Sequence, residues 1–251
     1  MPSYVKHLYY YKGKTSNVYI VVGPDGTYLI DSGMPSDVPI LQKILEHFPP
    51  LKRALFTHFH VDHISGWMLL EKRFKGVEAF FHENARPLLY GKKRVPFPPL
   101  RAWKDILVPC MREYGYVLGA RDVIYGMYGT PFRKGMALKN VQFFTRGDNL
   151  LPGFRMIHTP GHTPDSVSFY HPEKGILISG DFILVLNGKI SANTFLQNCY
   201  DQESSLGKIR KLDRLKTICP GHGPFAQIKQ ECDILSMPST RTSYRVGRTR
   251  W

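Results

Sequence analysis

The chain has 251 residues, of which 43% are hydrophobic and 22% charged, a composition typical of a folded globular protein with one domain-sized core. Its apolar runs extend over only a few residues, which excludes a membrane-spanning helix because such a helix needs about 20. The formal net charge of +14 favours an anionic partner, such as a small anionic substrate, nucleic acid or lipid, although the same charge also serves solubility.

The cysteines and the N-terminus bear on the cellular compartment. Cys110, Cys199, Cys219 and Cys232 include no Cys-x-x-Cys pair, which favours reduced thiols over a disulfide framework or a thiolate zinc site. The first residues lack the apolar core of a secretion signal, so the sequence predicts a cytoplasmic protein. Any bound zinc is therefore expected to have nitrogen and oxygen ligands.

The first third of the chain alternates strand and helix patterns. Residues 18–22 and 27–30 read as strands around a Pro24-Asp25-Gly26 turn, and they end at Asp31-Ser32-Gly33. Further along, the pattern predicts a helix over 38–48, a strand over 53–56, a helix from about 63 and a strand over 77–81. Such alternation is typical of a layered α/β architecture.

Residues 84–138 interrupt this alternation, and we interpret them as a helical insertion. Prolines punctuate its start, residues 102–118 carry apolar side chains on one helical side, and residues 121–128 predict a second short helix. The insertion is expected to lie over the functional site. Its aromatic residues either line a pocket or attach the insertion to the core: Trp103, Tyr114, Tyr116, Tyr125 and Tyr128.

The last part of the chain returns to strand character. Strands are predicted over 141–145, 155–159, 166–170, 175–179 and 217–219, with a helix over 202–215. We expect one domain over residues 1–236, with the insertion at about 84–138, followed by a basic tail over 237–251. The arginines of that tail are Arg241, Arg245, Arg248 and Arg250.

The segment Thr57-His58-Phe59-His60-Val61-Asp62-His63 carries the strongest chemical signal. Side chains two residues apart in extended chain project to the same side, so His58 and His60 can reach one point. As the chain turns into a helix, Asp62 and His63 face a second point nearby. The spacing therefore predicts ligands for two adjacent cations, since imidazole and carboxylate groups suit zinc, manganese or iron.

Three later loops each place a residue of metal-ligand type directly after a glycine at a strand end. His162 follows Gly161, Asp181 follows Gly180, and His222 follows Gly221. Glycine lets the backbone approach a metal closely. Each loop alone is more often structural, but their occurrence together with the first motif favours one metal site. His82, His158 and His171 are predicted to be structural.

The set His-x-His-x-Asp-His, followed in order by His162, Asp181 and His222, resembles the metallo-β-lactamase superfamily from Asp31 onward. The resemblance implies an α/β protein, an αβ/βα sandwich of two mixed sheets flanked by helices, with the site at one edge of the sheets. It also implies two metals: the first held by His58, His60 and His162, the second by Asp62, His63 and His222, with Asp181 bridging them.

The resemblance implies a dinuclear hydrolase, with zinc preferred over iron or manganese. Two adjacent cations activate water as a metal-bound hydroxide and polarise the substrate oxygen. Asp62 is the residue expected to orient the water or carry its proton. We expect a small-molecule ester, thioester or lactone as substrate, with the basic charge favouring an anionic one and nucleic acid as the second choice.

Departures from the subfamilies narrow the substrate. Asp181 argues against antibiotic hydrolysis, because class B β-lactamases generally lack the bridging carboxylate. Residues 182–189 lack the Gly/Cys/Arg-rich segment of glyoxalase II and persulfide dioxygenase relatives, and Leu184 replaces the catalytic tyrosine of acyl-homoserine lactonases. The alternative is a phosphodiesterase or ribonuclease of the same superfamily, which the charge of +14 fits. A mononuclear iron persulfide dioxygenase and a non-catalytic binding role rank lower.

Overall fold

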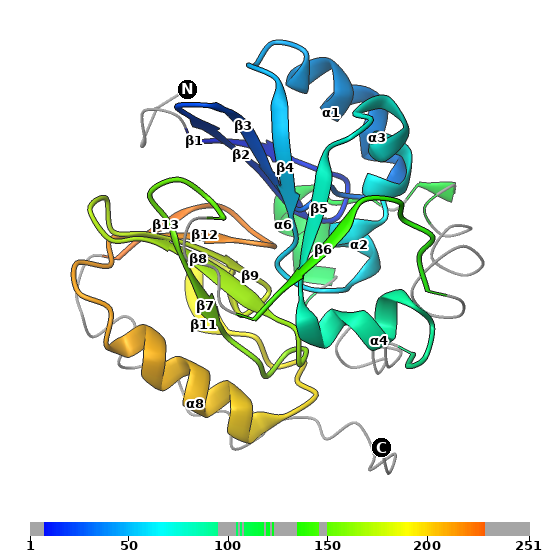
Figure 1. The fold of residues 1–251 in the computed structure, drawn as a ribbon. Coiled ribbons are helices and arrows are strands. Elements are labelled where there is room, and N and C mark those ends of the chain that lie inside the picture. The colour runs from blue at the N-terminus through cyan, green and yellow to red at the C-terminus, as the bar shows by residue number, and fades with distance from the viewer. Residues whose placement is uncertain are drawn as a thin grey trace. The chain divides into compact units, whose positions relative to one another are not determined.

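The computed structural model describes residues 8–94, 108–117, 135–145 and 150–228, together with residues 104, 106, 119, 120 and 122. The chain divides into two compact units (Figure 1). The N-terminal unit comprises Met1–Val95 and Tyr116–Thr145, and the C-terminal unit comprises Pro96–Gly115 and Arg146–Trp251. The expected domain bounds of 1–236 stay a prediction, and the basic tail at 237–251 lies outside the described residues.

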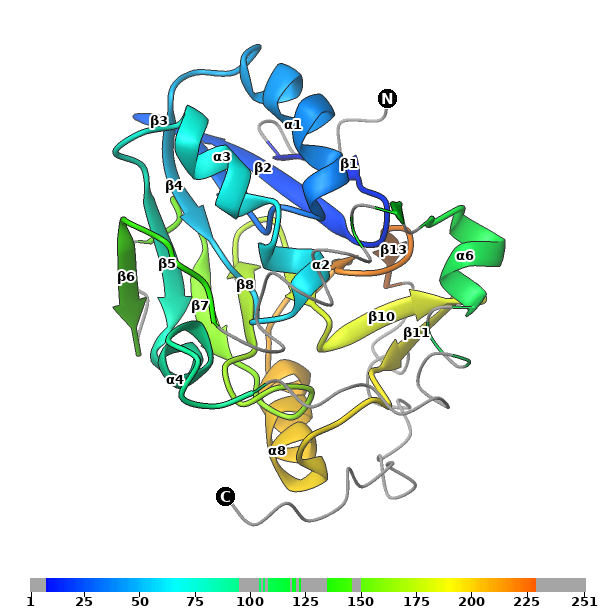
Figure 2. The same cartoon turned by 90° about the vertical axis from the view of Figure 1, so that its right-hand side faces the viewer.

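A six-stranded mixed sheet forms the N-terminal unit. Its strands are β1 (Leu8–Lys12), β2 (Asn17–Gly23), β3 (Gly26–Ile30), β4 (Leu51–Leu55), β5 (Glu78–His82) and β6 (Val141–Phe144), paired in that order. Its helices are η1 (Pro35–Asp37), α1 (Val38–Leu45), α2 (Val61–Ile64), α3 (Trp67–Arg73), η2 (Glu83–Ala85) and α4 (Arg86–Leu89). Figures 1 and 2 show α1 and α3 on the same face of this sheet.

The parallel part of this sheet determines where its functional loops emerge. β3, β4, β5 and β6 run parallel, with Leu55 opposite Ile30 on one side and Phe80 on the other. Their carboxyl ends therefore meet at one edge of the sheet. Leu29, Ala54 and Trp67 are among the fully buried residues that hold α1 and α3 against the strands.

The return of the chain into β6 is held by a side chain of α3. The Glu71 carboxylate accepts hydrogen bonds from the backbone N–H groups of Lys139 at 2.7 Å and Asn140 at 3.1 Å. The Asn140 carbonyl in turn accepts from Ala79 N–H at 2.8 Å. Glu71 is buried, so these charge-assisted bonds satisfy a carboxylate that would otherwise be costly to remove from water.

The C-terminal unit contains a five-stranded mixed sheet, a hairpin and two described helices. The sheet order is β13 (Ala226–Gln227), β12 (Thr217–Pro220), β9 (Ile176–Gly180), β8 (Val167–His171) and β7 (Arg155–His158). The hairpin is β10 (Ile183–Leu186) and β11 (Lys189–Ala192), and the helices are α6 (Val108–Tyr114) and α8 (Cys199–Arg210). β12 lies parallel to β9, so both strands end at the same edge.

The sequence of the long helix α8 explains both where the helix begins and which side it buries. The Asn198 side chain caps it by accepting from the N–H groups of Tyr200 and Asp201. Leu206 and Ile209 on its buried side belong to one apolar cluster with Leu177 of β9. The helix begins three residues before the predicted Gln202, because Asn198 is its cap.

The predicted α/β class, with two mixed sheets flanked by helices, is confirmed. The helix expected from His63 is instead two short helices, which separate at Ser65-Gly66, where a Cβ on Gly66 would lie 2.2 Å from the Ser32 carbonyl oxygen. No helix within the described ranges is long and apolar enough to cross a membrane.

The described part of the predicted insertion contains α4, α6 and a buried tyrosine. Tyr116 donates to the Asn17 Oδ1 at 2.9 Å and attaches its segment to the N-terminal unit. The side chain of Asp122 accepts from the N–H and hydroxyl of Ser36 in the same unit. Trp103, Tyr125 and Tyr128 lie outside the described residues.

Candidate metal centre

The first four predicted ligands lie together at the carboxyl end of β4. His60 is extended, with φ −112° and ψ 150°, and precedes α2, so the following Asp62 and His63 lie in the first helical turn. The His58 and His60 ring centroids are 4.6 Å apart, and those of His58 and His63 are 4.3 Å apart. The Asp62 Oδ2 lies 3.8 Å from the His63 Nε2. The spacing argument thus identified residues whose donor groups cluster.

Asp31 connects two of these histidines through one carboxylate. Its oxygens accept from the Thr57 N–H, from the Thr57 hydroxyl and from the His63 Nδ1, each at 2.8 Å. The Thr57 Oγ1 also lies 3.1 Å from the His58 Nδ1. Because the single hydroxyl proton goes to the carboxylate, the His58 Nδ1 must donate its proton to Thr57 Oγ1.

These hydrogen bonds assign the tautomers of His58 and His63. A carboxylate only accepts, so the His63 Nδ1 also carries its proton. His58 and His63 therefore present the lone pair of Nε2, which is the form in which neutral imidazole binds a metal. Asp31 was not predicted as a functional residue. The signal that could have found it is an Asp-Ser-Gly turn directly after a predicted strand, where Asp31 has a φ of 61°.

Backbone contacts hold the start of α2 against neighbouring loops. The His63 carbonyl accepts from the Ser32 N–H at 2.7 Å and the Ser32 hydroxyl at 3.0 Å. The Asp62 carbonyl accepts from the Ser16 hydroxyl at 2.5 Å. Ser16 and Ser32 are fully buried. These bonds tie the ligand-bearing turn to rigid parts of the sheet, as a preorganised site requires.

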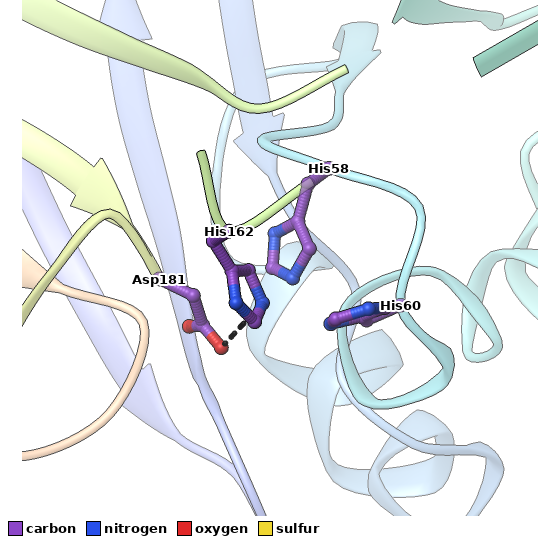
Figure 3. Close-up of side chains that lie close together, drawn as sticks. All are labelled: His58, His60, His162 and Asp181. Atoms are coloured by element: carbon purple, nitrogen blue, oxygen red, sulfur yellow. Dashed lines mark ion pairs between the residues drawn. The ribbon is translucent and has the colours of Figure 1, made fainter. Parts of the chain in front are cut away.

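The other three predicted ligands lie together in the C-terminal unit. His162 follows β7, Asp181 follows β9, and His222 follows β12. The Asp181 Oδ2 lies 3.6 Å from the His162 Nε2 and 3.1 Å from the His222 Nε2. Figure 3 draws His162 and Asp181 with a dashed line that marks this contact.

The partners of His162 assign its tautomer as well. Its Nδ1 lies 2.7 Å from the Phe195 carbonyl oxygen, which only accepts, so Nδ1 donates and Nε2 presents its lone pair. Two acceptor atoms, the His162 Nε2 and the Asp181 Oδ2, then lie 3.6 Å apart. Both atoms carry lone pairs, so a cation between them, either a proton or a metal ion, would relieve their repulsion in this buried setting. The donor set is all imidazole and carboxylate, which fits zinc, iron or manganese.

Neighbouring titratable residues are not suited to bind the metal. Burial raises the pKa of the Cys219 thiol, and Cys219 is not among the described residues that group as possible metal ligands. Burial also lowers the pKa of His158, whose Nε2 lies 2.9 Å from the Pro164 carbonyl oxygen. His82 accepts from the Asn84 N–H, and His171 packs edge-on against Phe154. The structural roles of these three histidines stay a prediction.

Comparison with known proteins establishes the family. The sequence profile described as "Metallo-beta-lactamase superfamily" matches residues 11–222. The chain belongs to the metallo-β-lactamase superfamily. With this membership and its His and Asp clusters, the protein is a metal-dependent hydrolase.

Relatives within the superfamily are distant. The chain is 27% identical over 177 residues to YobT of Bacillus subtilis, covering 68% of this chain and 64% of that protein. It is 26% identical over 206 residues to hydroxyacylglutathione hydrolase GloC of Haemophilus influenzae, covering 81% of this chain and 82% of that protein. Among solved structures, TTHA1623 in a di-iron-bound form is 25% identical, with a TM-score of 0.55 over 84% of this chain and 89% of that one.

Proposed function

We propose that the protein is a dinuclear metallohydrolase that cleaves a small-molecule carboxylic ester, thioester or lactone, with an anionic substrate favoured by the net charge of +14. In this proposal His58, His60 and His162 hold one divalent ion, while Asp62, His63 and His222 hold the second. Asp181 bridges both ions. Zinc is the proposed metal, with iron and manganese as alternatives.

The observation that carries the proposal is the set of partners at the Nδ1 atoms of three histidines, which assigns their tautomers. His58, His63 and His162 each donate from Nδ1 to the protein, so each directs an Nε2 lone pair outward. A histidine held this way is prepared to bind a metal without first losing a proton or reorienting. The Asp181 carboxylate, close to both His162 and His222, supplies the shared oxygen ligand.

The metal ions, Asp62 and the histidines have different roles in the proposed reaction. When bound, the two cations supply an acidified water and a Lewis acid for the substrate oxygen. Asp62, whose side chain is 22% exposed, orients the attacking water and accepts its proton on a carboxylate oxygen. The fixed imidazoles keep the site geometry from relaxing while charge develops on the substrate oxygen, because Asp31, Thr57 and Phe195 hold their rings.

Two findings from the comparisons support the finer parts of this proposal. The relative GloC is named a hydroxyacylglutathione hydrolase, which favours the ester and thioester class. The similar structure TTHA1623 is described in a di-iron-bound form, which favours two ions.

Metal analysis tests the dinuclear site. Purified protein should hold about two transition-metal ions per chain. His60→Ala and Asp181→Ala should each lose metal and at least about a hundredfold in turnover while staying folded by circular dichroism. The matched control is His47→Ala, because His47 is exposed and its Nδ1 contacts a backbone carbonyl, that of Lys43. One ion per chain, or full turnover in either ligand variant, would contradict the proposed site.

A substrate panel tests the reaction class. The panel contains a thioester, a lactone, an aryl ester and bis-p-nitrophenyl phosphate, assayed with the metal-loaded protein. We expect turnover of one or more of the first three substrates. The charge of +14 is the observation that favours phosphodiester cleavage instead, so strong turnover of bis-p-nitrophenyl phosphate with weak ester turnover would overturn the ranking.

A further inference from the structure

Asn193 directly follows β11, is fully buried, and contacts two of the three ligand-bearing loops of the C-terminal unit. Its Nδ2 donates to the Asp181 carbonyl oxygen at 2.9 Å, and its backbone N–H donates to the Phe182 carbonyl at 3.1 Å. Its Oδ1 accepts from the Phe195 N–H at 2.8 Å. One side chain thus joins the Asp181 loop to the segment that contains Phe195.

The Phe195 carbonyl is the group that accepts from His162. The His162 Nδ1 lies 2.7 Å from this carbonyl oxygen and 3.2 Å from the Asn193 Nδ2. Only one of these contacts can be a hydrogen bond in a given tautomer, since the carbonyl needs a donor and the amide NH2 needs an acceptor. The shorter contact assigns the proton to His162 Nδ1 and leaves the amide hydrogens for the Asp181 carbonyl.

The backbone of the same segment holds the His162 loop without help from this side chain. The Gln197 and Asn198 N–H groups donate to the Gly161 carbonyl at 2.9 and 3.0 Å. The Ser205 hydroxyl of α8 donates to the Pro160 carbonyl at 2.8 Å. The loop position is therefore fixed by several hydrogen bonds, and the Asn193 Oδ1 adds a bond to the residue whose carbonyl accepts from the ring.

We propose that Asn193 is a positioning residue, which sets the spacing between His162 and Asp181 and holds the His162 ring with its Nε2 lone pair toward the metal. The inference rests on the proposed function, because it assumes that both residues are metal ligands. It adds a buried amide that is not itself a ligand but acts on two of them.

The first experiment measures zinc affinity. Asn193→Ala should raise at least one zinc dissociation constant by about 10–100-fold in a competition titration with a chromophoric chelator. The matched control is Asn198→Ala, the same substitution on the same segment, at a residue whose side chain accepts from two N–H groups of α8. The control should lower the melting temperature while leaving zinc affinity within about threefold.

The second experiment observes the His162 ring directly in metal-free protein. Two-dimensional ¹H–¹⁵N spectra of the imidazole distinguish an Nδ1–H from an Nε2–H tautomer. The unsubstituted protein should show the Nδ1–H form of His162, and Asn193→Ala should show a mixture of the two forms. Asn193→Asp keeps the acceptor for the Phe195 N–H, so it should restore the Nδ1–H form.

The outcomes separate this inference from the proposed function. Zinc stoichiometry of the unsubstituted protein tests the proposed function. The ratio of zinc affinities between Asn193→Ala and the unsubstituted protein tests the role of Asn193. Unchanged zinc affinity in a folded Asn193→Ala protein would overturn the inference, and so would an Nε2–H tautomer of His162 in the unsubstituted protein. The His162 tautomer is measured in the unsubstituted protein, so this test holds even if Asn193→Ala fails to fold.

Discussion

Three candidate ligand histidines share one arrangement at their Nδ1 atoms. His58 donates to a hydroxyl, His63 to a carboxylate and His162 to a backbone carbonyl. The acceptors differ in chemistry but have the same consequence, because each assigns the ring proton to the nitrogen that points into the protein. Of these acceptors, Asp31 acts on two rings at once, directly on His63 and through Thr57 on His58.

Substitution of Asp31 by Asn should weaken both metal binding and the fold. Asn tolerates the φ of 61°, so the backbone is not strained, but its amide NH2 must face either Thr57 N–H or the His63 Nδ1. One buried hydrogen bond is lost, at a cost of about 1–3 kcal/mol in the free energy of unfolding. We expect zinc affinity to fall by about 10–100-fold in a chelator competition.

The control for this substitution is Asp25→Asn, in the exposed turn between β2 and β3, where Asp25 accepts from the Tyr28 hydroxyl. It should leave zinc affinity unchanged and stability within about 0.5 kcal/mol. If Asp31→Asn binds zinc as tightly as the control, the hydrogen bonds from Asp31 to His63 and to Thr57 have no role in metal binding.

The sequence indicated the candidate ligands but not the residues that orient them. His58 to His63 could be recognised because residue type and local spacing are both visible in the chain. Asp31 contacts Thr57 only because β3 pairs parallel with β4, a contact between residues 26 positions apart. Asn193 likewise depends on where the turn after β11 meets the end of β9. Such long-range pairings leave no local pattern.

At the level of elements, the His162 loop lies directly on α8. Gly161 has a φ of 146°, and a Cβ there would lie 2.2 Å from the Gln202 Oε1 and 2.6 Å from the Gln202 Cα. The Gln202 side chain also donates from Nε2 to the Phe182 carbonyl at 3.3 Å. The helix thus supports both the His162 loop and the loop after Asp181.

Two alanine substitutions that involve this helix should have opposite effects. Gly161→Ala should destabilise the protein by about 1–3 kcal/mol and reduce turnover, because the loop must move away from Gln202. Gly207→Ala, inside α8 with no atom within 4 Å of its added Cβ, should stabilise by about 0.5–1 kcal/mol. Denaturant titrations of both variants measure these differences. Equal stability of the two variants would show that the close approach of Gly161 is unimportant.

Helices and strands whose sequences follow a regular apolar pattern were predicted, and some of those without such a pattern were missed. The strands around Leu29, Ala54 and Leu177 were found because they are short apolar runs that end at turns. The hairpin of β10 and β11 was not predicted, although Asn187-Gly188 is a strong turn signal and both residues have positive φ. β1, Leu-Tyr-Tyr-Tyr-Lys, was missed because its sequence does not alternate between apolar and polar residues.

At the level of the whole molecule, metal binding should contribute to stability. The proposed ligands lie far apart in the sequence, so the unfolded chain is not expected to bind zinc well. Free zinc at 100 times the dissociation constant should then stabilise the folded state by about 2.7 kcal/mol. Thermal unfolding with zinc or with a chelator measures the shift. Asp181→Ala is the control, since it should unfold at a temperature that no longer depends on zinc.

The contact between Glu71 and the chain just before β6 has a consequence for how this protein tolerates change. Both N–H groups that Glu71 holds belong to Lys139 and Asn140, the last residues before β6. The position of β6 is therefore set by the hydrogen bonds of Glu71 to the two residues before the strand and by pairing with β5. Neither depends on how many residues precede Lys139. Insertions and deletions between α4 and Lys139 can accumulate without shifting the register of the sheet. The connection is thus open to evolutionary change of length, while the strand ends that carry His58 to His63 keep their places.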